Sequence, residues 1–550
     1  MINSAGNLVT VGTNAPRIGH HIYDGTAWVN EGILHESEAR TNLLSYSGVV
    51  TWTGWNVQTL NLSAVTAGSP FGSYQSASPP STASTEGQAY QIGKPLTSGA
   101  TYVGWALVKY SAGNGWFSVS HYNAGAAYGG NQRGWFDVQN GVVGTKDPTI
   151  TDHGMIDYGD GWWLCWVSKT AASTSGGINL GVTTGDGVFQ DRNSGDVILI
   201  AGSQFELGST PSSYIPTTTA TVTRAAETLT VPAANLPYPT TPVVIGPELV
   251  TNVGNPFTDT TGWSNFSNSP LTVSGGNLLG TPTTTATSRM DTPIPVVAGK
   301  VYQVTANAIQ YSGVGPTFGV LTSRNGGIAA GATATGVVGT NTQTFTATAT
   351  TNYYVTFGSN IPVVGVSDII SSVSVKEINP LSVSIQIDGK MTYADTGVTG
   401  EVEYYRWQLN SINYIFGYLS TQTGRSGQPV FAQRQSASGY DDVKGGDSDY
   451  SPDTNVPFNN AARHGSTFVN GAHEGTLLTA NTTPTILPDL SATDLSLGYN
   501  LMGTIGEFRM WSDDLGDVGI TEATLPSTEP SLSLTFDGSE TSFIVLDWSE

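Results

Sequence analysis

The segments 463–471 (RHGSTFVNG), 487–490 (LPDL) and 502–511 (MGTIGEFRMW) decide the fold class of this chain. The first is predicted to form two short strands around a tight Asn470-Gly471 turn, because an Asn-Gly pair between apolar residues is a strong hairpin signal. In 502–511 apolar residues alternate with polar ones, as in a strand with one buried face. Together they predict antiparallel strands of a β-sandwich.

The composition extends this prediction to the whole chain. Its 550 residues are enough for several domains, and 67 of them are glycine. Charged residues make up 11%, well below the roughly 25% of ordinary soluble chains. Helix surfaces are normally covered by Glu, Lys, Arg and Ala, so this composition favours strands and turns. We therefore expect an all-β protein built of several antiparallel β-sandwich (jelly-roll) domains.

The charge excludes two classes of partner. The chain has 42 acidic and 20 basic residues, which gives a net charge of −22. Nucleic acid binding needs cations at the phosphates, and polybasic membrane binding needs them at anionic lipids. No run approaches the roughly 20 apolar residues that span a bilayer, and residues 1–6 do not begin a secretory signal. We expect no nucleic acid partner, no membrane insertion, and synthesis in a cytoplasm.

The cysteine content limits how the fold is stabilised. Cys165 is the only cysteine, so stability has to come from packing or oligomerisation rather than from an intrachain disulfide. Its flanking tryptophans indicate a buried strand, where a thiol is more often inert than reactive.

The sequence of 463–511 resembles that of the concanavalin A-like, laminin-G-like jelly rolls found in virion proteins of tailed bacteriophages. Residues 1–45 carry an Arg-Thr-Asn-Leu-Leu motif near their end. They resemble the leader that precedes a sandwich in such proteins and are expected to serve as an attachment segment. Residues 46–222, with a Gly-Asp-Gly-Trp-Trp phrase at 159–163, resemble a carbohydrate-binding-type jelly roll.

The later segments predict a domain inserted into another. Residues 246–380 open with Leu-Val-Thr-Asn and Gly-Trp phrases, as in galactose-binding-like jelly rolls. Residues 223–245 resemble the first strand and linker of the laminin-G-like sandwich, which continues at 381–526, although a disordered linkage is the alternative. A short helix is expected near Asp513 to Glu522, and 527–550 are expected to form a C-terminal hairpin packed on a sandwich or a neighbouring subunit.

Aromatic residues indicate glycan binding. A sugar stacks its apolar face on an exposed ring while polar groups bond its hydroxyls, and the chain has 13 Trp and 23 Tyr. Trp116, Tyr122 and Trp135 lie beside Gly and Asn turns of the first sandwich, and Trp263 is the candidate in the inserted one. For each tryptophan the alternative is core packing.

Acidic clusters offer weaker alternatives. Asp186, Asp191, Asn193 and Asp196 carry oxygen ligands at a spacing that Ca²⁺ accepts, as do the aspartates of 447–453, although such loops are usually turns. No other cofactor is expected.

No residue is assigned a catalytic role, so no enzyme activity is expected. Glu401 and Glu403 share one strand face, as the two carboxylates of a glycosidase could. The alternative is that they are simply the solvent-exposed residues of that strand. His464 and Ser466 lack the nucleophile-elbow pattern.

The resemblance implies a bacteriophage virion surface protein, in the form of a tail fibre, head fibre, spike or capsid-attached appendage, that mediates adhesion to host surface polysaccharide. It also implies other virion proteins as partners and, by analogy, a homotrimer. The alternatives are a purely structural connector or decoration protein of the capsid or tail, and a polysaccharide depolymerase.

Overall fold

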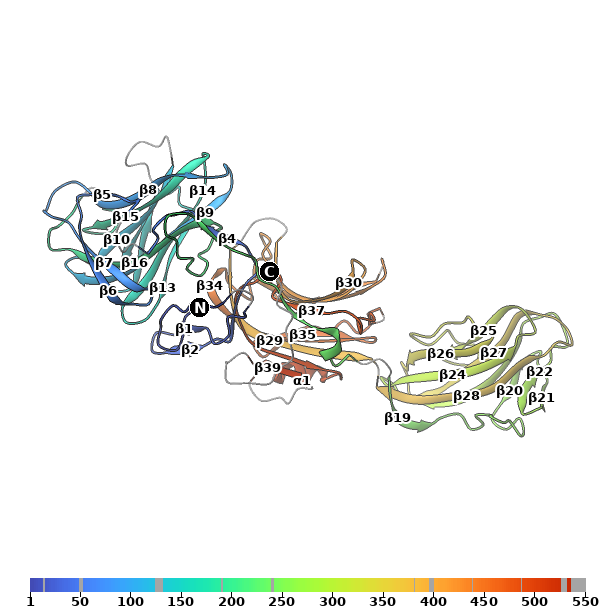
Figure 1. Ribbon diagram of the computed structural model, residues 1–550. Helices are drawn as coiled ribbons and strands as arrows, with labels where there is room; N and C mark the ends of the chain where they lie inside the picture. The colour runs from blue at the N-terminus through green and yellow to red at the C-terminus, as the bar shows by residue number, and fades with distance from the viewer. Residues whose placement is uncertain are drawn as a thin grey trace. The chain divides into compact units, whose positions relative to one another are not determined.

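The computed structural model describes residues 1–12, 15–48, 53–123, 132–188, 191–238, 242–379, 381–394, 400–437, 439–485, 487–525 and 532–535. Strands make up 55% of the chain and helices 2%, and every strand pairing is antiparallel among the described residues. The predicted all-β class with several antiparallel sandwiches is confirmed (Figure 1). No helix in this described part is long and apolar enough to cross a membrane.

The chain divides into two compact units. The first contains Met1–Tyr238, Val383–His464 and Phe468–Glu550, and the second contains Pro239–Ser382 with three residues from 465 to 467. The second unit is therefore flanked on both sides by chain that belongs to the first. This unit begins seven residues before the predicted insertion, 246–380, and ends two residues after it.

The first sandwich consists of two six-stranded sheets. In the β10 sheet the order is β12-β11-β10-β15-β8-β5, and in the β9 sheet it is β13-β14-β9-β16-β7-β6. The bounds are β5 (Asn56–Gln58), β6 (Asn61–Ser69), β7 (Gly72–Ser78), β8 (Gly87–Pro95), β9 (Thr101–Ala112), β10 (Trp116–Asn123), β11 (Arg133–Asp137), β12 (Val142–Lys146), β13 (Asp152–Asp157), β14 (Trp162–Thr170), β15 (Ser175–Thr183) and β16 (Val197–Leu207).

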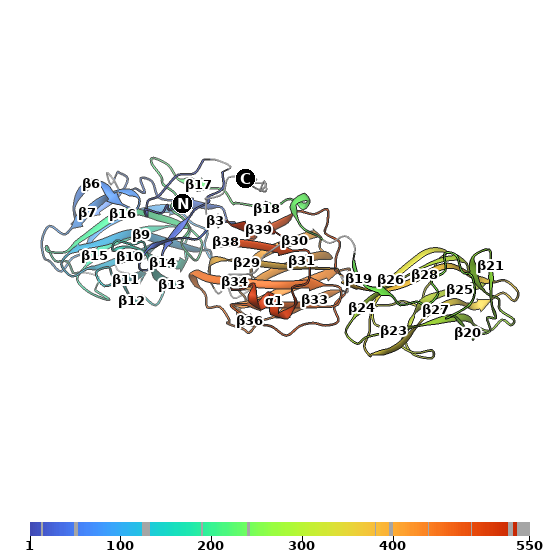
Figure 2. The ribbon, with the colours of Figure 1, turned by 90° about the horizontal axis from the view of Figure 1, so that it is seen from below.

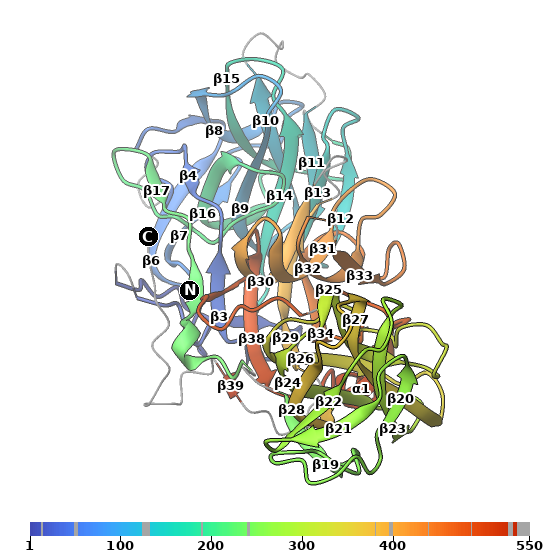
Figure 3. The same cartoon turned by 90° about the vertical axis from the view of Figure 1, so that its right-hand side faces the viewer.

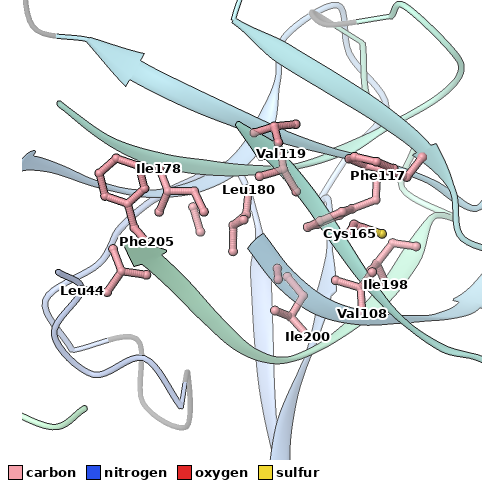
Figure 4. Packing of buried hydrophobic residues seen from close by; sticks show 14 of the residues in the cluster. Leu44, Val108, Phe117, Val119, Cys165, Ile178, Leu180, Ile198, Ile200 and Phe205 are labelled. Atoms are coloured by element: carbon pink, nitrogen blue, oxygen red, sulfur yellow. The ribbon is translucent and has the colours of Figure 1, made fainter. Parts of the chain in front are cut away.

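Alternate residues of these strands fill one core. Phe117 and Val119 of β10 and Ile178 and Leu180 of β15 are fully or almost fully buried, and they face Cys165 and the aliphatic side chains of the β9 sheet (Figure 4). Burial raises the pKa of the Cys165 thiol well above its ordinary value. The thiol is therefore neutral and packs as a small apolar group, as predicted.

A second sandwich in the first unit is built largely from the chain beyond the insertion. The β31 sheet has the order β18-β37-β30-β31-β32-β33, and the β29 sheet contains β3-β38-β29-β34-β35-β36 with β39 beside β38 (Figure 2). The bounds are β18 (Leu229–Val231), β29 (Ser382–Tyr393), β30 (Glu401–Asn410), β31 (Asn413–Ser420), β32 (Gln428–Gln435), β33 (Tyr440–Lys444), β34 (Asp453–Gly465), β35 (Val469–His473), β36 (Thr476–Leu477), β37 (Leu495–Leu497), β38 (Met502–Trp511) and β39 (Leu532–Thr535).

The two segments predicted to flank the insertion lie in different sheets of this sandwich. β18 pairs with β37 in the β31 sheet, and β29 pairs with β38 in the β29 sheet. The sheets pack on each other, because the Tyr405 hydroxyl of β30 lies 3.1 Å from Nε2 of His464 on β34.

The predicted Asn470-Gly471 turn is wrong. Arg463 pairs with Asn470 and His464 with Val469, so the hairpin turns between Gly465 and Phe468. A Cβ at Gly471 would lie 2.1 Å from the Phe431 ring. Glycine at 471 therefore serves close packing between the two sheets, and residues 465–468 form the turn.

The N-terminal segment is partly built into the first unit. It contains β1 (His21–Tyr23), β2 (Trp28–Asn30), β3 (Ile33–Glu36) and β4 (Arg40–Asn42). β3 is fully buried and pairs with β38, while β4 pairs with β17 (Val222–Arg224). The expected attachment role of 1–45 stays a prediction, and any docking has to use parts other than β3.

The second unit is a jelly roll of two sheets. One has the order β21-β22-β28-β24-β26 with β19 beside β28, and the other has the order β20-β23-β27-β25. The bounds are β19 (Val243–Glu248), β20 (Ser264–Ser267), β21 (Leu271–Ser274), β22 (Asn277–Gly280), β23 (Ser288–Val296), β24 (Val301–Gln310), β25 (Gly313–Leu321), β26 (Gly339–Thr346), β27 (Thr351–Pro362) and β28 (Asp368–Asn379).

Helical structure is confined to short pieces in the described residues. α1 (Gly516–Glu522) forms where the sequence predicts it, with Asp517 in its first turn, and η1 (Ala233–Asn235) is a single 3₁₀ turn. Of the predicted C-terminal hairpin, β39 pairs with β38, and residues 536–550 lie outside the described residues.

Candidate functional site

The outward face of the β10 sheet carries polar side chains across its centre. Strands alternate their side chains between faces, so the neighbours of buried Phe117 and Leu180 point away from the core. Ser118 of β10 lies opposite Gly181 of β15, which lies opposite Gln88 of β8. Figure 3 shows that β8, β15, β10 and β11 follow one another in the sheet.

A hollow opens at the middle of this face. A Cβ at Gly181 would lie 2.6 Å from the Ser118 hydroxyl oxygen, so glycine keeps the floor low. The volume is about 10 Å³, close to the room of one buried water molecule, so it takes a single hydroxyl group rather than a whole sugar. The lining residues are Glu86, Gly87, Gln88, Ser118, Arg133, Asn179, Gly181, Val182 and Thr183.

A chain of side-chain amides forms one wall of the hollow. Gln88 Nε2 donates to Gln58 Oε1 at 2.9 Å, and Asn179 Nδ2 donates to Gln88 Oε1. This arrangement leaves Asn179 Oδ1 without a hydrogen-bond partner, although the residue is only 8% exposed. A buried acceptor without a donor costs roughly 1–3 kcal/mol. The wall therefore presents an acceptor that needs a hydroxyl or amide donor.

A charged pair forms the opposite rim. Arg133 NH2 lies 3.3 Å from Glu86 Oε2, and both side chains are largely buried. Burial lowers the pKa of Arg133 to about 10 and raises the pKa of Glu86, with the neighbouring opposite charge offsetting only part of each effect. Arg133 and Glu86 therefore form a largely buried ion pair at this rim.

Two of the predicted aromatic residues flank the hollow. Trp116 and Tyr122 are half-buried and lie on β10, two residues before and four residues after Ser118. Six residues of a strand span roughly 20 Å. The rings therefore mark the two ends of a face that is long enough for several sugar units.

Trp135 and Trp263 are buried, contrary to their predicted glycan contacts. Trp135 lies on the same face, but it is 4% exposed and its Nε1 donates to the Val188 carbonyl at 2.8 Å, so the 184–188 loop covers it. Trp263 is 7% exposed, belongs to the core of the second unit and donates to the Asn252 carbonyl. Loop packing therefore buries the Trp135 ring, and core packing buries the Trp263 ring.

The predicted Ca²⁺ ligands are not brought together. Asp186 accepts hydrogen bonds from Thr145, whereas Asp196 accepts them from Asn114. Asn193 accepts from Thr82, and Asp191 is exposed. Among the described residues no group of three or more His, Cys, Asp or Glu side chains could hold a metal ion. Asp186, Asn193 and Asp196 therefore each bond a segment that is distant in the sequence.

The weighed catalytic residues are engaged elsewhere. Glu403 is fully buried and pairs with Arg406, whereas Glu401 is exposed. Burial lowers the pKa of His464 to about 3, so its imidazole is neutral and faces Tyr405 across the core rather than Ser466.

The amide wall was missed in the sequence, although a signal for it was present. The segment 178–182 reads INLGV, in which Ile178, Leu180 and Val182 alternate with Asn179 and Gly181. That alternation assigns Asn179 and Gly181 to the outward face. Only the sheet order shows that Gln88 and Arg133 lie nearby.

Comparisons with known proteins leave the family open. No protein-family model and no curated protein matches the sequence. A leech intramolecular trans-sialidase complexed with 2,7-anhydro-Neu5Ac is 17% identical over 27% of this chain and 24% of its own, with a TM-score of 0.22. The CBM22-1-CBM22-2 tandem domain of Paenibacillus barcinonensis Xyn10C is 11% identical over 62% and 98%, with a TM-score of 0.20.

A third solved structure is similarly distant. The binding domain of botulinum neurotoxin serotype D is 10% identical over 48% of this chain and 45% of its own, with a TM-score of 0.21. This chain spans about a quarter of the trans-sialidase and under half of the toxin domain. At such TM-scores these likenesses carry no argument about function.

Proposed function

We propose that this chain is a carbohydrate-binding protein, and that the outward face of its β10 sheet binds an uncharged glycan. The observation that carries the proposal is Asn179 Oδ1, a buried acceptor without a partner in the wall of the hollow at Gly181. Ligand sites combine a few fixed polar groups of this kind with apolar contact surface. Here Trp116 and Tyr122 provide the apolar surface.

The mechanism follows from the positions of these groups. One sugar hydroxyl enters the hollow and donates to Asn179 Oδ1, and neighbouring hydroxyls accept from Arg133. Apolar C–H groups of sugars further along the chain stack on Trp116 or Tyr122. Each contact is shallow and weak, so useful adhesion needs many copies.

The charge of the site favours an uncharged ligand. Arg133 and Glu86 neutralise each other at the rim. An anionic glycan would also approach a chain of net charge −22 against long-range repulsion.

The biological setting belongs to the same proposal. The resemblance of 463–511 to phage virion jelly rolls supports a tailed-bacteriophage surface protein, made in the host cytoplasm and displayed on the virion, where it binds host surface polysaccharide. A homotrimer and contacts with other virion proteins are part of this proposal. Cryo-electron microscopy of the particle tests it: density for this chain outside the capsid or tail is expected, and its absence from the virion contradicts the setting.

One observation favours a structural connector as the second candidate. In the second unit Val314 and Ile361 are cross-strand neighbours, and both are strongly exposed, as are Val363 and Val364. Exposed apolar groups of this kind mark protein contacts. Under this alternative the purified protein binds no glycan and instead binds another virion component.

The proposal includes no hydrolytic activity. Glu403 is buried against Arg406, so the carboxylate pair weighed in the sequence lacks one accessible partner. Incubation of the protein with each polysaccharide that it binds is expected to release no reducing ends. Release that is lost in Glu401→Gln identifies a depolymerase instead.

The main test is affinity electrophoresis of the full chain through gels containing dextran, mannan, xylan or laminarin. Retardation by at least one polymer is expected. Gly181→Leu, which fills the hollow, should reduce it, while Gly185→Ala in a nearby loop, with only an ordinary contact to Val188, should not. Circular dichroism verifies the fold of both variants. No retardation of the native chain, or equal retardation of the folded Gly181→Leu variant, contradicts the proposal.

A further inference from the structure

The outward face of the β31 sheet carries rings rather than a hollow. Tyr405 and Trp407 of β30 are fully buried toward the core. Arg406, between them, lies opposite Phe416 of β31, which lies opposite Ala432 of β32. These residues point away from the core. We name the residues Tyr499, Arg406, Phe416, Tyr414 and Tyr440 on this face the tyrosine stripe.

One end of the tyrosine stripe is a supported ring. The Arg406 guanidinium carbon lies 4.0 Å from the centroid of the Tyr499 ring and 4.9 Å from that of Phe416. Glu403 holds this guanidinium, with Nε 2.5 Å from the carboxylate. Tyr499 is nevertheless 46% exposed. The cation occupies the inner face of the ring, so the exposed part is its outer face and edge.

The other end is also a fixed and exposed ring. Tyr440 of β33 is 45% exposed, while its hydroxyl hydrogen-bonds with Tyr418 and Asp442. Burial, followed by the neighbouring Tyr418 and Asp442, raises the pKa of this phenol. The phenol therefore stays protonated and anchored. A ring held at its hydroxyl end presents a fixed surface at little entropic cost on binding.

The extent of the face sets the size of the ligand. Tyr499 follows β37, and its carbonyl accepts a hydrogen bond from the Glu403 backbone of β30. Because β37, β30, β31, β32 and β33 are consecutive neighbours in the sheet, the backbones of Tyr499 and Tyr440 are separated by four steps of about 4.8 Å, or roughly 19 Å. Tyr414 and Phe416 lie between the ends, stacked with their centroids 4.1 Å apart. The stripe therefore suits an extended chain of several sugars that crosses the strands, rather than a monosaccharide.

The cations on this face are engaged within it, while the Glu401 carboxylate is exposed beside Glu403. Arg406 pairs with Glu403, and Lys444 pairs with Asp442 at 2.8 Å. Arg434 donates to backbone carbonyls, among them that of Ser436 at 3.1 Å. These cations are already engaged, so the face offers polar hydrogen-bonding groups and rings without a free cation for an anionic ligand.

We propose that the tyrosine stripe is a second binding site, for an uncharged, extended oligosaccharide that stacks on Tyr499 and Tyr440. This site lies on a different sandwich from the hollow at Gly181 and does not depend on it. A polymer that binds both sites of one chain would be held more tightly than by either site alone.

The test uses affinity electrophoresis in dextran, mannan, xylan and laminarin, with alginate as an anionic control. Each measurement is made in the Gly181→Leu background, so that the hollow cannot contribute. The dissociation constant for at least one uncharged polymer should rise roughly tenfold or more in Tyr440→Ala/Tyr499→Ala. Tyr499→Phe keeps the ring and should bind like its parent.

The outcomes separate the two sites. Binding that survives Gly181→Leu and is lost in the double tyrosine variant supports the stripe, whether or not the hollow binds. Unchanged binding in the folded double variant, or no binding by the Gly181→Leu parent, overturns the stripe. A preference for alginate over all four uncharged polymers also overturns it.

Discussion

The β10 sheet and the β31 sheet are both six-stranded sheets with one face on a core, yet their outward faces differ. At the centre of the first, glycine and amide side chains leave a hollow with an unpartnered acceptor on Asn179. At the centre of the second, stacked Tyr414 and Phe416 fill the equivalent space. The comparison teaches that alternate residues of a strand set the binding chemistry of a face, while the fold sets only its flatness and extent.

The largest expected effect tests which side chains of β10 face inward. Phe117→Ala should lower the free energy of unfolding by about 3–5 kcal/mol, because it empties part of a close-packed core. Ser118→Ala, one residue on, should change it by less than about 1 kcal/mol. Urea unfolding of the full chain, followed by tryptophan fluorescence, measures both. Equal losses would break the comparison, because Ser118 would then not lie on an outward face.

Acid should destabilise both sandwiches, because each has a buried histidine in its core. Burial lowers the pKa of His121 and of His464 to about 3 each, from an ordinary 6.5. The unfolded chain takes up these protons below about pH 6.5 and the folded chain does not. The stabilisation is therefore complete above pH 6.5 and is lost as the pH falls toward 3.

Between pH 6.5 and pH 5 each histidine should cost about 2 kcal/mol of unfolding free energy. Denaturant unfolding at the two pH values measures the loss. His121→Gln should reduce the pH dependence of the first sandwich, and His464→Gln that of the second. A pH dependence that neither substitution reduces would contradict the neutral buried histidines.

Asn179→Ala sharpens the comparison at the hollow itself. It removes the unpartnered acceptor, and glycan affinity should fall about tenfold, or about 1.4 kcal/mol. The control is Asn56→Ala, because Asn56 lies on the edge strand β5 and is exposed. Isothermal titration with a fragment of whichever polysaccharide binds measures both variants, and equal affinities would remove Asn179 from the site.

The smallest expected effect is that of salt. The cations at both faces are engaged, so the dissociation constant for an uncharged glycan should change less than about twofold between 0.05 and 0.5 M NaCl. A steep fall in affinity with salt would indicate an ionic ligand at one of the faces. Measuring the Gly181→Leu and double tyrosine variants separately assigns any such dependence to one site.

The sequence predicted the fold class and a number of individual strands, but fewer of the site residues. The alternation in 502–511 indicates β38, and the aromatic run around Cys165 indicates β14, since period-two patterns are local. Trp116 and Tyr122 were proposed from another local signal, the Gly and Asn turns beside them, and their glycan contacts stay a prediction. The burial of Trp135 depends on a loop some 50 residues away, and that of Trp263 on the core of its jelly roll.

The position of the 463–471 turn illustrates the same limit. Asn-Gly is a strong turn signal when only local preferences act. Gly471 is instead required beneath the Phe431 ring of the facing sheet, which no local pattern reveals. The meeting of Gln58, Gln88 and Asn179 likewise depends on strand order across 120 residues, so the amide wall could be found only after the sheet was known.

Hydrogen–deuterium exchange of the full chain, with and without the polysaccharide that retards it most, tests the central claim most directly. The account predicts slowed exchange at the amides of β8, β10 and β15 around Gly181, and loss of that protection in Gly181→Leu. Protection confined to other strands, or none in a complex that demonstrably forms, would contradict the assignment of glycan binding to the outward face of the β10 sheet.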